Sequence, residues 1–339
     1  MDRHRARITG TRIVGARIAA VLLACSLLGS VAAPTDALAA TLPIRSARWI
    51  APGANKVKLL SEKPSECLAK PATQELAYQV EIGRAAFNTP LLLGGQASRA
   101  GLQCESCHRG GRTNREFFFP HVSGRPGTAD VTTSVFSSHR GDGIDNPKPI
   151  PDLSGPRELL KVSRDPRKPD LRNFIHGLVT EEFDGAESPR AVMDGLAAYV
   201  RSLRPDACPP DPIQPIRMES VMADATRAMH AAEAAAVRKD GATAILMVAS
   251  ARTQLGLIYE RYQAPSLSAE RVALRDADLD LASIQNDVRK GDAGAAMRLA
   301  LWPGQAATLT GKLQAHEDKS LFNPRQLAAA VRRARARKS

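Results

Sequence analysis

Residues 104–108 read Cys-Glu-Ser-Cys-His, and the rest of the domain is best understood outward from this stretch. Two cysteines separated by two residues and followed at once by a histidine can form two thioether bonds and one axial iron bond. The two vinyl groups of a haem lie on adjacent pyrrole rings, so their cysteine partners must be close in sequence. The stretch therefore predicts one covalent haem c, held by Cys104, Cys107 and His108.

Two other uses of paired cysteines fit the sequence less well. A structural zinc site would need two further ligands at matching spacing, and the chain has no second CxxC. A thioredoxin-like redox pair would need a βαβ pattern around it, which the sequence lacks.

The N-terminus has the pattern of a secretory signal, expected over residues 1–39. Five arginines precede an apolar run at 18–33, and Ala37 and Ala39 fit an A-x-A cleavage site. A membrane anchor is the alternative, but the run is shorter than the roughly 20 residues that a spanning helix needs. Cleavage before Cys25, as in a lipoprotein, is a further variant. No later segment is expected to cross a bilayer. The pattern predicts a periplasmic protein, attached to a membrane only through an uncleaved or lipidated N-terminus.

Four cysteines remain after such cleavage: Cys67, Cys104, Cys107 and Cys208. The haem would take two of them, and an exported compartment permits disulfides. We therefore expect a Cys67–Cys208 bridge, which would tie an extended N-terminal arm at 40–72 to the end of a haem domain at 73–208.

The haem domain is expected to contain helices at 73–88, 171–179 and 190–203, because apolar residues recur there at spacings of three and four. In c-type cytochromes the first and last helices cross, with a small residue such as Gly83 permitting close approach to an aromatic. Residues 109–156 are rich in Gly, Pro, Ser and Asp, and irregular stretches of this length are usually functional. Here the stretch could wrap a cofactor.

A proline-rich linker is expected at 209–216, because prolines at that density cannot continue a helix. Residues 217–323 then show helical periodicity and a faint repeat, in which 237–240 recurs as 288–291. Two helical hairpins would make an antiparallel four-helix bundle, with the last helix kinked or broken at Pro303. A basic tail at 324–339 is expected to be disordered. The predicted fold class is all-α: a cytochrome c-like haem domain with long loops, followed by this bundle.

The chain also resembles a known family. Residues 82–88, 104–108, 146–153 and 196–203 are similar to one haem domain of the bacterial di-haem cytochrome c peroxidase and MauG superfamily. The likeness covers residues 74–206 and implies that the proline-leucine segment at 146–153 packs beside the haem. Family members carry two haems, whereas this chain has one CxxCH. The family's electron-transfer haem takes a methionine after that segment, and 155–165 contains no Met.

The distal ligand of the iron is therefore not assigned by analogy. Many members use a loop histidine before the proline-leucine segment, and His139 is the nearest match. His121 is the next candidate, followed by His176 and Met193, and an iron without a second protein ligand is the remaining alternative. Two strong ligands would favour electron transfer, whereas an open or displaceable site would permit peroxidase chemistry.

Charged residues suggest further contacts. Arg112, Arg115 and Arg140 are candidates to pair with haem propionates, although a solvated cationic loop would explain them equally well. The net charge of +12 falls to about +9 once the +3 of the first 40 residues is removed, which suits acidic proteins or anionic lipid headgroups. No basic stripe is interleaved with aromatic residues, so nucleic acid is set aside.

Three functions compete at this stage. The preferred one is electron transfer by a mono-haem cytochrome with a redox partner protein, which could be a second cytochrome. The second is a peroxidase-like oxidoreductase acting on hydrogen peroxide, so the sequence leaves open whether the chain is an enzyme. The third is a haem-bearing sensor or scaffold whose output comes from the C-terminal bundle.

Overall fold

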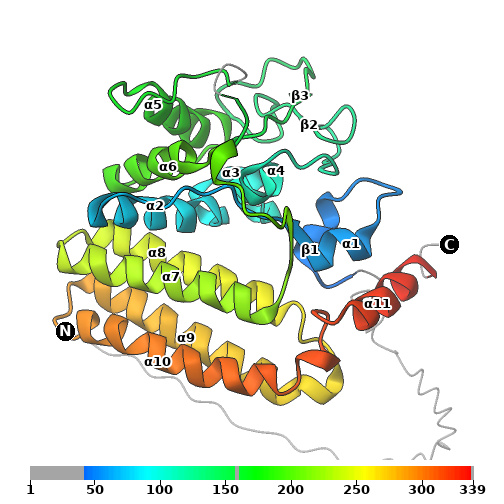
Figure 1. Ribbon diagram of the computed structural model, residues 1–339, viewed down its shortest axis with the longest axis vertical. Coiled ribbons are helices and arrows are strands. Elements are labelled where there is room, and N and C mark those ends of the chain that lie inside the picture. The colour runs from blue at the N-terminus through cyan, green and yellow to red at the C-terminus, as the bar shows by residue number, and fades with distance from the viewer. Residues whose placement is uncertain (1–41, 157–159, 337–339) are drawn as a thin grey trace, which may run out of the picture. The chain divides into compact units, whose positions relative to one another are not determined.

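The computed structural model describes residues 42–156 and 160–336, and these residues are mostly helical (Figure 1). Their strands form two short antiparallel pairs. The all-α expectation is confirmed at this level. The expected signal peptide at 1–39 lies outside the described residues.

The N-terminal arm was expected to be extended, but it is only partly so. It contains a short helix α1 (Lys56–Ser61), which Asn55 caps by accepting a hydrogen bond from the Lys58 N–H. Strand β1 (Glu62–Pro64) follows and pairs with β4 (Ile213–Pro215). The expected linker at 209–216 is therefore partly a strand. Prolines are tolerated in it because a two-stranded pair leaves outward-facing edges that need no donor.

Helices α2 (Gln74–Phe87) and α6 (Arg190–Ser202) pack directly on each other and lie close to the predicted ranges. A Cβ atom on Gly83 would stand 2.0 Å from the carbonyl oxygen of Gly195, so the two backbones touch. The close approach expected at Gly83 is thus made to another glycine. An aromatic ring is the partner one turn further on, where Tyr199 packs 5.1 Å from Phe87.

The long stretch between these helices is mainly irregular, as expected. Its elements are short: 3-10 turns at Pro90–Leu92 and Arg109–Gly111, α3 (Gly95–Ala100), α4 (Cys104–Cys107), and the paired strands β2 (Thr128–Ala129) and β3 (Lys148–Pro149). Helix α5 (Asp170–Gly177) continues into a π-helical turn, Leu178–Glu182.

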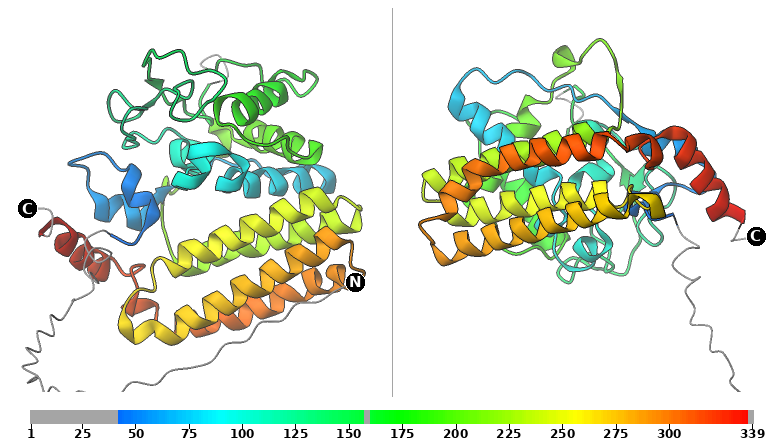
Figure 2. Two further views of the ribbon diagram at one scale, coloured as in Figure 1. Left: turned by 180° about the vertical axis from the view of Figure 1, so that it is seen from behind. Right: turned by 90° about the horizontal axis from the view of Figure 1, so that it is seen from below.

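Four long helices follow: α7 (Met218–Val237), α8 (Gly241–Tyr259), α9 (Ser268–Lys290) and α10 (Ala295–Gln314). We call them the C-terminal helices. Each of the pairs α7–α8, α8–α9, α9–α10 and α10–α7 is in contact (Figure 2). The repeat seen in the sequence marks the ends of helices, with Asp240 capping α8 and Gly291 ending α9 in the left-handed region. Helix α10 runs on through Pro303, so of the two expectations, a kink or a break, the break is not found.

Helix α8 corrects a further expectation. By length and composition it is apolar enough to cross a bilayer, although no segment after the signal was expected to be. Half of its apolar window is buried inside the protein, where α8 packs on α7, α9 and α2. The burial explains the composition, because a helix surrounded by other helices is apolar on several sides.

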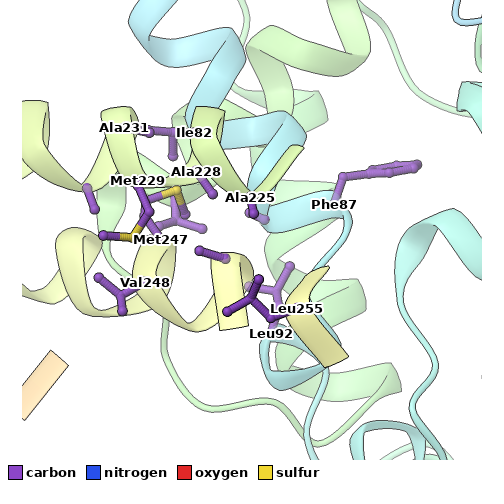
Figure 3. Packing of buried hydrophobic residues seen from close by; sticks show 14 of the residues in the cluster. Ile82, Phe87, Leu92, Ala225, Ala228, Met229, Ala231, Met247, Val248 and Leu255 are labelled. Atoms are coloured by element: carbon purple, nitrogen blue, oxygen red, sulfur yellow. The ribbon is translucent and has the colours of Figure 1, made fainter. Parts of the chain in front are cut away.

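The C-terminal helices share one hydrophobic cluster with α2 and α6. Figure 3 shows Ile82 directed toward Met229 and Met247, whereas Phe87 points away from them. A hydrogen bond from the Ser250 hydroxyl to the Ala85 carbonyl, 2.9 Å long, adds a polar contact. The two regions that the sequence separates are therefore packed together. We refer to residues 42–208 as the motif region.

The basic tail, expected to be disordered, forms helix α11 (Pro324–Ala336). Leu327 and Val331, four residues apart, are buried in a second, smaller cluster with Ile44 and Leu60. This spacing gives the tail one apolar side, which α1 and the first of the described residues cover.

Candidate functional site

The CxxCH motif forms the single helical turn α4 and ends in His108, whose backbone N–H donates to the Cys104 carbonyl at 2.9 Å. Asn114 holds the turn from the far side. Its side chain donates to the Ser106 carbonyl at 2.8 Å, and its backbone N–H donates to the Cys107 carbonyl at 3.0 Å. The turn is thus fixed by main-chain contacts before any cofactor is considered.

The imidazole of His108 is oriented by the proline-leucine segment. Its Nδ1 lies 3.1 Å from the carbonyl oxygen of Pro151. A carbonyl can only accept, so Nδ1 carries the proton and Nε2 keeps its lone pair. Within residues 42–156 and 160–336, Nε2 makes no hydrogen bond. Burial lowers the pKa of His108 to about 4, so the ring is neutral at neutral pH, the form that binds a metal.

The proline-leucine segment is itself tied to the loop after the motif. The Thr113 hydroxyl donates to the Ile150 carbonyl at 2.9 Å, and the Leu153 N–H donates to the Gly111 carbonyl at 3.1 Å. These bonds flank the carbonyl that holds His108. The imidazole is therefore positioned by two segments some forty residues apart in the chain.

The two motif cysteines form no disulfide. Both side chains are partly accessible and pack against the main hydrophobic cluster. Burial nevertheless raises the pKa of Cys104 and of Cys107 to about 12. The two thiols are thus surrounded mostly by protein atoms, although solvent still reaches part of each side chain. Both thiols are therefore protonated at neutral pH.

An aromatic pair backs the imidazole. The Phe87 ring is 6.4 Å from the His108 ring and 5.1 Å from Tyr199, and both aromatic residues are buried. The Tyr199 hydroxyl donates to a Glu66 carboxylate oxygen at 3.0 Å, and that carboxylate also pairs with Arg84 at 2.6 Å. The side chains behind the His108 ring are thus mainly apolar, and the buried Tyr199 hydroxyl among them is hydrogen-bonded.

Residues within and next to the motif attach it to α1. The Arg109 guanidinium donates to the carbonyls of Leu59 and Glu62, the latter at 2.6 Å. The Glu105 carboxylate accepts the Gly110 N–H at 2.9 Å. Burial raises the pKa of Glu105 to about 7, with Lys63, the Gly110 hydrogen bond and Arg109 opposing the shift.

Cys67 and Cys208, which the sequence pairs as a disulfide, are bonded to each other with an S–S distance of 2.01 Å. Their Cα atoms are 3.9 Å apart, inside the limit of about 7 Å beyond which no bridge could form. The Arg204 N–H donates to the Cys67 carbonyl at 2.8 Å beside the bridge. The arm is thus fixed to the end of α6 by covalent and hydrogen bonds.

The candidate distal ligands differ in exposure and in the groups they contact. His139 is exposed, with Nε2 3.9 Å from an Asp184 carboxylate oxygen. His176 Nε2 lies 2.8 Å from a carboxylate oxygen of the exposed Glu187. His121 is exposed in a turn, and Met193 is buried on α6. None of the polar contacts of the three histidines involves the motif, so His139 as distal ligand stays a prediction.

Two of the arginines proposed for the propionates are paired with acids of the chain. Arg112 lies 3.2 Å from an Asp152 carboxylate oxygen, and the Nε of Arg140 donates to Glu181 at 2.9 Å. Arg115 is exposed. The Arg140 pair is exposed, where a carboxylate partner exchanges at little cost, whereas the Arg112 pair is partly buried.

Two polar side chains of the site were missed from the sequence. Arg164 is buried and donates to the carbonyls of Leu153, at 2.8 Å, and Leu203, at 2.5 Å, which joins the proline-leucine segment to the end of α6. Trp49 stacks on Phe119 at 4.7 Å, and its buried Nε1 has no hydrogen-bond partner in the described part of the chain. Neither residue stands in a recognisable motif, because the partners of both are brought to them only by the fold.

No group of three or more histidine, cysteine or acidic side chains in the described ranges is arranged to hold a metal ion by itself. Comparison of the chain with protein families, curated proteins and solved structures finds no match. Its function must therefore be argued from its own residues.

Proposed function

We propose that this chain is an exported c-type cytochrome that binds one haem through Cys104, Cys107 and His108 and serves in electron transfer with a redox partner protein. The observation that carries the proposal is the hydrogen bond from His108 Nδ1 to the Pro151 carbonyl. Metal-binding histidines almost always donate their second ring N–H to such an acceptor, which fixes the tautomer and the ring orientation.

The residues present fit the group. The two thiols are unpaired and the imidazole offers a lone pair on Nε2. The buried Trp49 Nε1–H has no hydrogen-bond partner among the described residues, and the Trp49 carbonyl accepts the Phe118 N–H. This unpaired N–H is a donor suited to an acidic substituent such as a propionate. When bound, the haem would supply one-electron redox chemistry. This chain's part is to hold the imidazole neutral and oriented and to line its back with Phe87 and Tyr199.

The proposal includes a finer view of the fold. Residues 73–208 are proposed to be a cytochrome c-like domain, supported by the packing of α2 on α6 around the motif. Residues 217–323 are proposed to be an antiparallel four-helix bundle. Short connections between α7 and α8, and between α9 and α10, support this, because they return the chain alongside itself.

Covalent attachment is the direct test. The mature protein, made with the haem-attachment machinery present, should have the mass of the polypeptide plus one haem. Cys104→Ala with Cys107→Ala should remove that mass, while the matched pair Cys67→Ala with Cys208→Ala should keep it. Wild-type protein of polypeptide mass alone would contradict the proposal.

Peroxidase activity is the second candidate, because each distal histidine with a described contact faces a carboxylate of the chain. An iron lacking a strong second ligand could be reached by hydrogen peroxide. Absorption spectra of the ferric and ferrous protein separate the two functions. A low-spin spectrum in both states supports electron transfer, whereas a high-spin component that reacts with peroxide supports the enzyme.

His139→Gly sharpens this test. If His139 binds the iron in solution, its loss should raise the high-spin fraction and speed the reaction with peroxide. An unchanged spectrum would leave His121 as the next candidate.

A further inference from the structure

Helix α11 carries a basic face. Its arginines are all exposed: Arg325, Arg332, Arg333 and Arg335. The helix contains no acidic residue. At about 100° per residue, the first three arginines lie on the side opposite the buried Leu327 and Val331. The helix therefore presents a row of guanidinium groups directly away from the protein.

These arginines lack acidic partners. Within residues 42–156 and 160–336, no carboxylate forms an ion pair with an arginine of α11. Some helical arginines elsewhere in the described chain are paired across helices, as Arg252 is with Asp278 and Arg298 with Asp280. Like charges within one or two turns repel each other. An uncompensated cluster of this kind fits a partner that supplies the negative charge.

The position of α11 restricts the partner. Its apolar side is covered by Ile44 and Leu60, so the helix cannot sink that side into another surface. Only the charged side is free to bind. Helix α1 lies beside α11 (Figure 1), and its Lys58 is exposed. The partner must therefore be recognised by charge over a surface, with no apolar pocket.

The sequence indicates a membrane. Leu42, at the start of the described chain, packs against the cluster that holds α11. Eight residues separate the end of the apolar run at 18–33 from Leu42. If that run enters a bilayer during export, as the proposed function implies, the connection from the run to Leu42 spans at most about 30 Å, since an extended chain covers at most about 3.6 Å per residue. Arginine forks also match phosphate oxygens, which they bind in pairs.

We propose that the basic face of α11 docks this protein on the surface of an anionic phospholipid bilayer through contacts between its arginines and lipid phosphates. The contact is electrostatic and peripheral. It would persist after removal of the apolar run, and it does not depend on the haem.

Vesicle binding by the full chain tests the proposal. The protein should sediment with vesicles made of equal parts phosphatidylglycerol and phosphatidylcholine, and binding should fall steeply as salt is raised. Each arginine near an anionic surface contributes about fivefold in affinity. Arg325→Gln, Arg332→Gln and Arg333→Gln together should therefore weaken binding about a hundredfold. The substitutions leave Leu327 and Val331 in place, so the fold should be unaffected.

A matched triple variant controls for net charge. Arg289, Lys290 and Lys312 are exposed on α9 and α10, and changing all three to Gln removes the same charge from another surface. This control should bind within a few fold of the wild type. Equal losses in the two variants would overturn the proposal, because the effect would then follow net charge alone.

Two further outcomes also count against it. Salt-resistant binding to pure phosphatidylcholine, unchanged in the α11 variant, would assign attachment to the apolar run. Binding of soluble polyglutamate by α11 with no affinity for anionic vesicles would assign the face to an acidic protein. Mass spectrometry for the haem is unaffected by any of these results, so this proposal can fail independently of the proposed function.

Discussion

The motif region and the C-terminal helices are held by different kinds of contact. In the motif region two helices touch backbone to backbone at Gly83 and Gly195, and a disulfide and main-chain hydrogen bonds fix the long loops. In the C-terminal helices apolar side chains fill the space, with Met229, Met247 and Trp302 among the most deeply buried.

The difference is one of redundancy. Several contacts that fix the motif region join positions far apart in sequence, as with His108 and Pro151. Side chains in the C-terminal helices recur every three or four residues, so the loss of one leaves its neighbours in place. We therefore expect single substitutions to affect the motif region most.

Removal of the disulfide should have the largest effect. The bridge spans 141 residues, and the loss of a native disulfide typically costs about 2–5 kcal/mol. Cys67→Ala with Cys208→Ala should lower the free energy of unfolding by that amount in a denaturant titration.

Reduction of the wild-type protein provides the control. Mild reductant should reproduce the loss in the wild type and leave the double variant unchanged. An undiminished free energy of unfolding in the variant would show that the β1–β4 pairing already holds the arm without the bridge.

Gly83→Ala tests the helix contact. The added Cβ would overlap the Gly195 carbonyl at 2.0 Å, so α2 and α6 would have to separate. Overpacking of this kind costs about 1–3 kcal/mol, and a clash with backbone belongs at the upper end. Urea unfolding measures the loss.

Gly256→Ala in α8 is the matched control. The nearest atom to its added Cβ would be the Arg45 Nη2 at 3.8 Å, an ordinary contact. We expect the stability to be unchanged or slightly increased. Equal losses at both glycines would contradict the distinction between the two regions.

The same distinction explains what the sequence could predict. Periodic apolar residues identified α2 and α6 within one or two residues, and Thr73 caps α2 where the pattern begins. The repeat around Asp240 falls at a turn between two helices. Such a repeat is found because each pair of helices has similar residues at its turn. Patterns of this kind are local, and so is the CxxCH itself.

Contacts across the chain were not predictable in this way. The Pro151 carbonyl is a backbone acceptor, and the Arg164 guanidinium donates to backbone carbonyls. Residue types therefore do not reveal these partners. Strand β4 is too short for any period, and its prolines suggested a linker. Because α11 is rich in arginine, its two buried apolar residues were not recognised from the sequence as one side of a helix. The site could thus be found from its motif, whereas the supports that orient it could not.

Glu105 should give the motif region a distinct pH dependence. Burial raises the pKa of Glu105 to about 7, so the folded state prefers the protonated acid. The contribution of this residue is most favourable below the ordinary pKa of about 4.5 and is lost as the pH rises through about 7. Glu105→Gln should flatten the stability profile over that window, on the order of 1 kcal/mol after allowance for partial solvent access.

Glu219, an exposed carboxylate on α7, supplies the comparison. Glu219→Gln should leave the profile as it is in the wild type. Denaturant titrations at a series of pH values measure both. A wild-type slope retained in Glu105→Gln would mean that another group in the motif region titrates.

The smallest expected effect is a gain, and it is expected in the C-terminal helices. Gly311 lies inside α10 and is exposed, with no atom near the position of an added Cβ. Glycine within a helix costs about 0.5–1 kcal/mol relative to alanine because it loses more backbone freedom on folding. Gly311→Ala should therefore stabilise the protein by about that amount, seen as a higher denaturant midpoint with an unchanged slope. A gain here beside a loss at Gly83 would show that the same substitution changes sign with the kind of helix contact. A loss of stability in Gly311→Ala would instead mean that the added methyl group meets a close neighbour on the outer side of α10. The contrast between backbone contact in the motif region and side-chain packing in the C-terminal helices would then be wrong.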